Sequence, residues 1–287
     1  MSYRTILAAV SGGSAADGAV ELAGRLAGEF GASLEGFHIQ IDPVQIIATS
    51  FDGAVSMPLP TGWIDDLTHE AVATAAKARS SFLAAAERHQ IPATDVSPLV
   101  PARAIWRMEI GDASSLLAAR ARFFDLIVLG RSERVAGNPH SDAIERVVCY
   151  SGRPVLIAPK APPATLAEKI AICWNGSPQS VRAVSAAMPL LARAGTTKIF
   201  TIDADEEMDV ASLRRYLEGH AVSAEHRSLR SDRKVDLGDR LIEAANDAGT
   251  DLLVLGGYGH MPWRETLFGG ATRSVLRSSL FPILLAH

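Results

Sequence analysis

Residues 251–259 have the sequence DLLVLGGYG, and residues 269–273 have the sequence GGATR. The apolar run that opens the first stretch predicts a buried parallel strand, because such strands are covered on both faces and do not alternate. The glycines that follow let the backbone approach an anion closely, and the amides of the next helix's first turn point toward it. Together the two stretches predict a phosphate-binding site near the C-terminus.

Three segments of the chain occur twice, in the same order. The pairs are ILAAVSG (6–12) and IAICWNG (170–176), DLIVLG (125–130) and DLLVLG (251–256), and PVLIA (154–158) and PILLA (282–286). Matched segments in one order indicate a duplication. We therefore predict an N-terminal domain at 1–160 and a C-terminal domain at 166–287, with the Pro-containing segment 161–164 as linker.

Within each copy, short apolar runs alternate with longer helical patterns. Strands are predicted at 5–10, 34–39, 105–109, 125–129 and 154–158, and at 169–174, 198–202, 223–229, 251–255 and 282–285. Helices are predicted at 15–30, 64–89, 114–123 and 142–150, and at 179–194, 210–218, 237–248 and 271–278. This alternation with right-handed crossovers predicts an α/β protein with two tandem, doubly wound, five-stranded parallel-sheet domains. An insertion at 42–62 in the first copy is predicted to be a lid or a partner surface.

Composition excludes several classes of partner. The 287 residues are 48% hydrophobic and 21% charged, so both domains have enough apolar side chains for a core. The net charge of -4 and the lack of a long basic run argue against nucleic acid, and no apolar run reaches the roughly 20 residues that span a bilayer. The first residues lack the apolar core of a signal peptide, which predicts a cytoplasmic protein. Cys149 and Cys173 stand alone in apolar surroundings, and we expect small buried side chains in a reducing compartment.

The glycines carry a family resemblance. Gly256 and Gly259 are separated by two residues, and Gly259 and Gly269 by nine, which is the spacing of the nucleotide motif of universal stress proteins. The whole chain outside the insertion resembles a tandem universal stress protein. One position departs from the motif, since Gly270 stands where the family has Ser or Thr.

The resemblance implies a site for ATP or another adenine nucleotide, with Mg²⁺, in the C-terminal domain. It would lie between the first and fourth strands of that domain, where the chain order reverses. The residues expected to form it are Trp174, Asn175, Gly176, Ile202, Gly256, Gly259, Gly269, Gly270, Ala271 and Thr272. Asn175 replaces the family's acidic residue and would read the base edge, Trp174 and Ile202 would flank the base, and the Thr272 hydroxyl would replace the missing Ser or Thr.

The first copy of the motif is altered. Gly130 is retained, but Glu133 replaces the second glycine and residues 141–142, Ser and Asp, replace the glycine pair. A carboxylate at Asp142 would repel a phosphate, and Ser11 is shorter than the family's acidic residue. We therefore predict that the N-terminal domain does not bind ATP.

Three functions remain open at this point: a nucleotide-binding stress-response or signalling adaptor, an interaction module that binds no nucleotide, and a slow ATP-hydrolysing enzyme. The glycines after the strand are also compatible with a tight turn, and Gly269 and Gly270 with close packing of the last helix. No catalytic residue is evident, and there is no Cys/His cluster with metal-ligand spacing. The sequence SGG at 11–13 is similar to the loop of ATP pyrophosphatases, but Ala15 and Ala16 lack that loop's acid and hydroxyl.

The last strand of each copy is apolar and would form an exposed edge if it were unpaired. In universal stress proteins the last strand of each copy often pairs across an interface, so the resemblance implies that the strands at 154–158 and 282–286 pair with each other within one chain, as a pseudo-two-fold counterpart of a single-domain dimer. A homodimer and further protein partners are also compatible with the sequence.

Overall fold

The computed structural model describes residues 2–40, 62–95, 102–131, 143–161, 163–203, 207–231, 235–257 and 270–287. The N-terminal half contains β1 (Thr5–Ala9), α1 (Ser14–Phe30), β2 (Ser33–Gln40), α3 (Trp63–Arg88), β3 (Ala104–Ile110), α4 (Ala113–Ala121), β4 (Leu126–Gly130), α5 (Ala143–Tyr150) and β5 (Val155–Ala158). The C-terminal half contains β6 (Lys169–Cys173), α6 (Pro178–Leu191), β7 (Thr196–Ile202), α7 (Glu207–Gly219), β8 (Ala224–Leu229), α8 (Leu237–Asp247), β9 (Leu252–Gly256), α9 (Gly270–Ser278) and β10 (Ile283–Ala286).

The ten strands form one sheet in the order β3-β2-β1-β4-β5-β10-β9-β6-β7-β8. Read outward from the centre, each half has the same order, and all pairings within a half are parallel. The chain order therefore reverses between β1 and β4 and between β6 and β9, which confirms the predicted switch points. The doubly wound α/β fold is confirmed with them.

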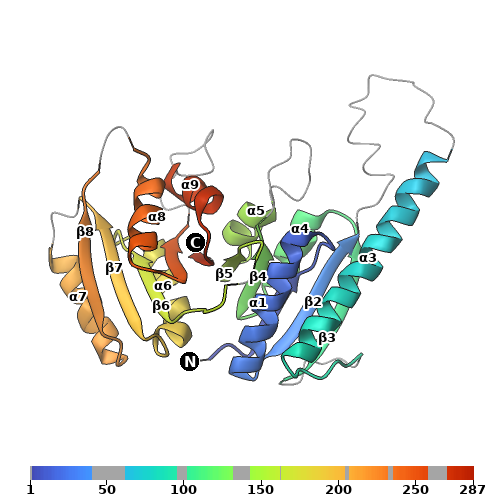
Figure 1. Cartoon of the computed structure of the whole chain (residues 1–287), viewed down its shortest axis with the longest axis horizontal. Helices are drawn as coiled ribbons and strands as arrows, with labels where there is room; N and C mark the ends of the chain where they lie inside the picture. The colour runs from blue at the N-terminus through green and yellow to red at the C-terminus, as the bar shows by residue number, and fades with distance from the viewer. Residues whose placement is uncertain are drawn as a thin grey trace.

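The two halves join at the centre of the sheet, where β5 and β10 lie side by side (Figure 1). These strands pair antiparallel, with Leu156 opposite Leu284 and Ile157 opposite Ile283. The pairing confirms the prediction that the two apolar edge strands satisfy each other within one chain. Since both strands are completely buried, neither presents a free edge to another molecule.

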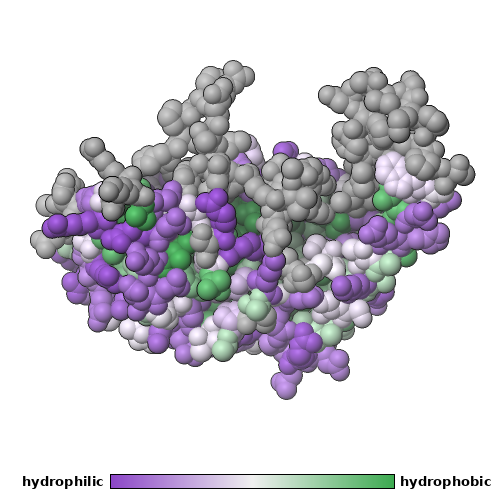
Figure 2. Space-filling view, turned by 45° about the horizontal axis from the view of Figure 1, so that its top comes forward, coloured by the Kyte–Doolittle hydropathy of each residue, from purple (hydrophilic) through white to green (hydrophobic). Residues whose placement is uncertain are grey.

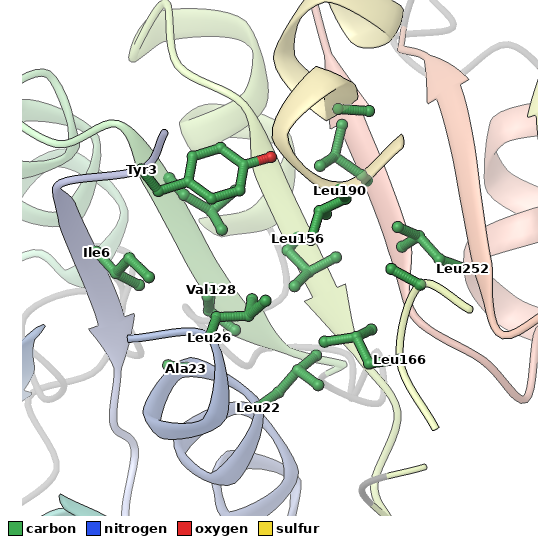
Figure 3. Packing of buried hydrophobic residues seen from close by; sticks show 14 of the residues in the cluster. Tyr3, Ile6, Leu22, Ala23, Leu26, Val128, Leu156, Leu166, Leu190 and Leu252 are labelled. Carbon is green, nitrogen blue, oxygen red and sulfur yellow. The ribbon is translucent and has the colours of Figure 1, made fainter. Parts of the chain in front are cut away.

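Two hydrophobic clusters cover the two faces of the sheet, and each cluster extends across both halves. Helices α1, α3, α6 and α7 cover one face, and α4, α5, α8 and α9 cover the other. Figure 3 shows the first cluster at the junction, where Leu156 of β5 lies among side chains from both halves, including Leu22, Leu166 and Leu190. The apolar, non-alternating strands of the sequence are thus explained by burial on both faces.

Polar contacts also link the halves. The buried Tyr3 hydroxyl donates a hydrogen bond to the carbonyl oxygen of Ala186 in α6 at 2.7 Å. The Tyr3 ring lies edge-on to the Phe30 ring, with 5.2 Å between the ring centroids. The guanidinium of Arg193, in the C-terminal half, lies over the Phe30 ring at 4.9 Å from its centroid. The two halves are therefore held together by side chains as well as by the sheet.

Every strand and helix predicted from the sequence is present, with ends that differ by a few residues. The largest differences are three residues, at the end of α6 (Leu191 instead of residue 194) and at the start of α7 (Glu207 instead of residue 210). The insertion predicted at 42–62 lies outside the described residues except for Gly62, the residue before α3. No helix in the described segments is long and apolar enough to cross a membrane, and in the view of Figure 2 apolar residues form only small separate areas of the surface.

Candidate functional site

The predicted C-terminal site lies at the carboxyl ends of three neighbouring strands. Strand β6 pairs with β9 on one side and with β7 on the other, and Cys173 at its end lies opposite Leu255 and Phe200. The segments that follow these strands therefore begin next to one another. The structure thus brings together Asn175, Ile202 and Gly256, from three separate parts of the sequence.

The loop after β6 is held by its own hydrogen bonds. Gly176 has a φ of +70°, in the left-handed region where glycine has no steric cost. The Asn175 Oδ1 atom accepts hydrogen bonds from the Ser177 amide at 3.2 Å and the Ser177 hydroxyl at 2.7 Å. Ser177 in turn is the N-cap of α6, since its hydroxyl accepts a hydrogen bond from the Ser180 amide at 3.2 Å. Asn175 is exposed, and because its Oδ1 atom is used within the loop, its amide nitrogen is the group that can donate to a ligand.

Trp174 has an unusual environment for a tryptophan. Its backbone nitrogen donates to the Phe200 carbonyl at 2.8 Å, so the residue continues the ladder between β6 and β7. The ring is partly buried against the first hydrophobic cluster, and its Nε1 atom is buried without a hydrogen-bond partner among the described residues. Buried polar atoms in proteins are nearly always paired, so an unpaired one requires an explanation.

Trp174 and Ile202 do not face each other. Trp174 packs against the cluster on the α6 side of the sheet, whereas Ile202 packs against the cluster on the α8 side. The alternation of side chains along parallel strands places them on opposite faces. A ring that contacts both residues therefore has to lie across the ends of the strands and not on either face.

Gly256 has a structural role that the sequence did not reveal. A Cβ atom at this position would lie 2.5 Å from the Ser180 amide nitrogen and 2.8 Å from the Gln179 carbonyl carbon. Strand β9 and the first turn of α6 therefore approach each other too closely for any side chain. The next residue, Gly257, donates its amide to the Ala286 carbonyl at 2.8 Å and continues the pairing with β10.

Helix α9 begins at Gly270 and includes the predicted residues Ala271 and Thr272 in its first turn. Thr272 is buried, with 6% of its surface exposed. Gly259 and Gly269 lie outside the described residues, so their predicted contacts stay predictions.

The corresponding end of the N-terminal half is occupied by aromatic side chains. Val10 donates to the Phe37 carbonyl at 2.9 Å, as Trp174 does to Phe200. The buried His38 ring has its Nδ1 atom 2.6 Å from the Val10 carbonyl oxygen and stacks on Trp106 at 6.0 Å. At the matched place in the C-terminal half, Thr201 Oγ1 lies 2.9 Å from His226 Nε2, and His226 is exposed. The pair of side chains at this position is therefore more exposed to solvent in the C-terminal half than in the N-terminal half.

Neither cysteine has the chemistry of a reactive thiol. Both are free. Burial, with a smaller effect of Glu145, raises the pKa of Cys149 to about 11, and burial raises the pKa of Cys173 to about 12. Both therefore stay protonated at neutral pH. Across the described residues, no group of three or more His, Cys, Asp or Glu side chains is arranged to hold a metal ion.

Solved structures share this architecture. A universal stress protein from Archaeoglobus fulgidus DSM 4304 matches 98% of this chain over 97% of its own, with a TM-score of 0.71 and 12% identity. A putative universal stress protein from Pseudomonas aeruginosa UCBPP-PA14 matches 99% of this chain over 93% of its own, with a TM-score of 0.54 and 13% identity. A functionally unknown protein from Pseudomonas aeruginosa PAO1 gives a TM-score of 0.54 at 12% identity, over 99% of this chain and 92% of its own.

No family model matches the sequence, and no curated protein matches it. The likeness therefore rests on structure. The fold defines a doubly wound α/β protein built from two similar units that share one sheet. This chain has the fold of the universal stress proteins, in its tandem form.

Proposed function

We propose that the C-terminal half binds an adenine nucleotide and that the protein acts as a nucleotide-dependent stress-response or signalling adaptor. The domains of this proposal are 1–160 and 166–287. The base would lie across the ends of β6 and β7, and the phosphates would face the first turn of α9, with Mg²⁺ as their counterion. Cytoplasmic localisation and a homodimer of the chain are further parts of the proposal.

The observation that carries the proposal is the buried Trp174 Nε1 atom, which makes no hydrogen bond to a described residue and belongs to the residue directly before the exposed Asn175. Both residues supply hydrogen-bond donors in the loop that follows β6, at the switch point where doubly wound sheets bind their ligands. An adenine ring carries nitrogen acceptors on its edges and an apolar face, which suits two donors next to a tryptophan ring. The N-terminal half has Val10 and Ser11 in their place.

A second candidate function is supported by a different observation. Gly256 is required by its contact with α6, and Asn175 Oδ1 is used by the α6 N-cap. Both residues would therefore be retained in a protein that binds no nucleotide. In that case the chain would be an interaction module, and slow ATP hydrolysis would be excluded with binding.

Tryptophan fluorescence separates these functions. Nucleotide-stripped protein is titrated with ATP, ADP and AMP in the presence of Mg²⁺, together with the variants Trp174→Phe and Trp106→Phe. We expect a saturable change in emission that is retained in Trp106→Phe and lost in Trp174→Phe. No saturable change with any nucleotide in calorimetry of the same protein would favour the interaction module, and a signal lost only in Trp106→Phe would place the ligand in the other half.

A further inference from the structure

Arg131 is a charged residue near the junction of the two halves, and the matched position in the other copy carries no charge. It directly follows β4 and donates its backbone amide to the Ala158 carbonyl at 3.1 Å. Its counterpart in the other copy is Gly257, which makes the same bond to Ala286. The N-terminal half therefore places a guanidinium group where the C-terminal half has no side chain.

One end of this guanidinium is fixed by the other half of the molecule. The Nη1 atom donates a hydrogen bond to the carbonyl oxygen of Ser279, the residue that follows α9. A cation at this end of a helix is favoured by the helix dipole. The contact anchors the Arg131 side chain between the two halves.

The rest of the guanidinium makes no hydrogen bond to a described residue. The Nε and Nη2 atoms are buried and make no hydrogen bond, and no carboxylate of the described residues forms an ion pair with Arg131. Burial lowers the pKa of Arg131. Arginine nevertheless stays protonated in proteins, so this charge is partly desolvated and has no counterion among the described residues. Such a charge is costly unless it is paired.

The two free atoms define the shape of the missing partner. Nε and Nη2 are adjacent donors on one side of a planar group, which is the arrangement that binds two oxygens of a carboxylate or phosphate side-on. We propose that Arg131 binds a small oxyanion, a carboxylate or a phosphate group, through Nε and Nη2 at the junction between β4 and α9. This site is separate from the nucleotide site, which faces the other end of α9, and does not depend on it.

Thermal unfolding in different anions tests the site. The protein is melted in chloride, acetate and phosphate at equal pH and ionic strength, together with Arg131→Met, Arg131→Lys and a control, Arg153→Met. Arg153 also donates to a carbonyl at the end of a helix, that of Arg122 at 2.9 Å, but is exposed. We expect the unaltered chain and Arg153→Met to melt about 2–4 °C higher in acetate or phosphate at roughly ten times the dissociation constant. Arg131→Met should show no such gain, and Arg131→Lys a smaller one because lysine lacks the fork.

The choice of anion identifies the ligand class. A gain in acetate alone indicates a carboxylate ligand, and a gain in phosphate alone indicates a phosphate ligand. To exclude phosphate at the nucleotide site, the melt is repeated with Thr272→Val, in which the gain should persist. An equal gain in Arg131→Met, or no gain in the unaltered chain, would show that Arg131 only caps α9.

A second readout covers the case in which the Met variant fails to fold. The Nε–H signal of Arg131 in a ¹H–¹⁵N spectrum is assigned by its loss in Arg131→Lys. It should shift saturably when acetate or phosphate is added to the unaltered chain. An Arg131 signal that stays in place while both anions are added overturns the proposal.

Discussion

The two halves of the molecule share a frame and differ in what lies at its carboxyl edge. In both, an Asp before the fourth strand accepts backbone amides from the start of the first strand: Asp125 binds those of Arg4 and Thr5 at 2.9 and 3.0 Å, and Asp251 binds that of Lys169 at 2.9 Å. A left-handed glycine follows the first strand in both, with φ of +78° at Gly12 and +70° at Gly176.

The edge itself has diverged. The N-terminal half has filled it with the stacked His38 and Trp106 and has placed Arg131 at the junction, whereas the C-terminal half leaves a tryptophan donor unpaired. Helix coverage differs too, since α3 has 26 residues and α7 has 13. The comparison teaches that the strand pairings of the two halves can stay the same while the side chains at the carboxyl ends of the strands differ.

The largest expected effect is on the pairing of β5 with β10, which joins the two halves into one sheet. Ile283 and Ile157 lie opposite each other at the junction and are fully buried. A lysine at either position would bury an unpaired charge, so Ile283→Lys and Ile157→Lys should each abolish cooperative unfolding or cause aggregation. Denaturant unfolding and size-exclusion chromatography measure this, with Val181→Lys, at a position 51% exposed, as control. An unchanged melting temperature in either junction variant would contradict the account of a shared sheet.

A smaller loss of stability is expected from a buried ion pair that is present in the N-terminal half and has no counterpart at the matched position of β7. The Glu35 side chain is 1% exposed and accepts two hydrogen bonds from Arg120, at 2.7 and 2.6 Å. Removing one partner of a buried pair leaves the other uncompensated, so Glu35→Ala should lower the free energy of unfolding by about 2–3 kcal/mol, less than for a fully buried pair because Arg120 is partly exposed. Lys198 lies at the matched position of β7, and Lys198→Ala should change the free energy of unfolding by less than about 0.5 kcal/mol. Equal losses in urea unfolding would show that the pair has no special role in the first half.

The proposed nucleotide site predicts that substitutions at matched positions of the two halves change nucleotide affinity by different amounts. Asn175→Ala removes one hydrogen-bond donor to the base and should weaken nucleotide binding about 5–10-fold, or about 1–1.4 kcal/mol. Ser11→Ala, at the matched position of the N-terminal half, should leave the dissociation constant within about twofold. Because Asn175 also supports the α6 N-cap, melting temperatures of both variants are needed to separate lost folding from lost binding. Equal affinity in both variants would remove Asn175 from the site.

The smallest expected effect is a dependence of stability on pH in the N-terminal half. Burial raises the pKa of Glu21, but hydrogen bonds and charges from Arg88 and His89 outweigh it, and the net shift is downward. A lowered folded-state pKa gives stability that is present above the unfolded value of about 4.3 and is lost as pH falls through the folded value.

Glu21→Gln should therefore be less stable by about 0.5–1 kcal/mol at pH 7 and equal to the unaltered chain near about pH 3. Glu243→Gln serves as control, because Glu243 pairs with Arg240 on an exposed helix surface. Chemical unfolding across this pH range measures both. A constant difference between Glu21→Gln and the unaltered chain would contradict the ionic origin of the effect.

The fold was accessible from the sequence because its signals are local. Apolar runs such as LLVL at 252–255 identify buried strands without knowledge of their neighbours. The apolar last strands, together with the family resemblance, predicted the pairing of β5 with β10. The site was accessible only in part. Whether Trp174 and Ile202 lie on the same face of the sheet depends on the register between β6 and β7, because side chains alternate between the two faces along each strand.

The contacts that the sequence did not reveal join distant residues. Glu35 and Arg120 are 85 residues apart, and Arg131 and Ser279 are 148 residues apart. A glycine required by packing, such as Gly256 against Ser180, has the same sequence signature as one required by a phosphate. Only the tertiary structure distinguishes these cases.

The central claim, one frame with one nucleotide site, is tested most directly by calorimetric titration of Mg²⁺ with ATP, ADP or AMP into nucleotide-stripped protein. The account predicts saturable binding of at least one nucleotide near one site per chain, abolished by Gly259→Glu in the C-terminal motif and unaffected by Ser11→Ala in the N-terminal half. Binding at two sites per chain, or binding that survives Gly259→Glu, would contradict it, as would the absence of binding by all three nucleotides.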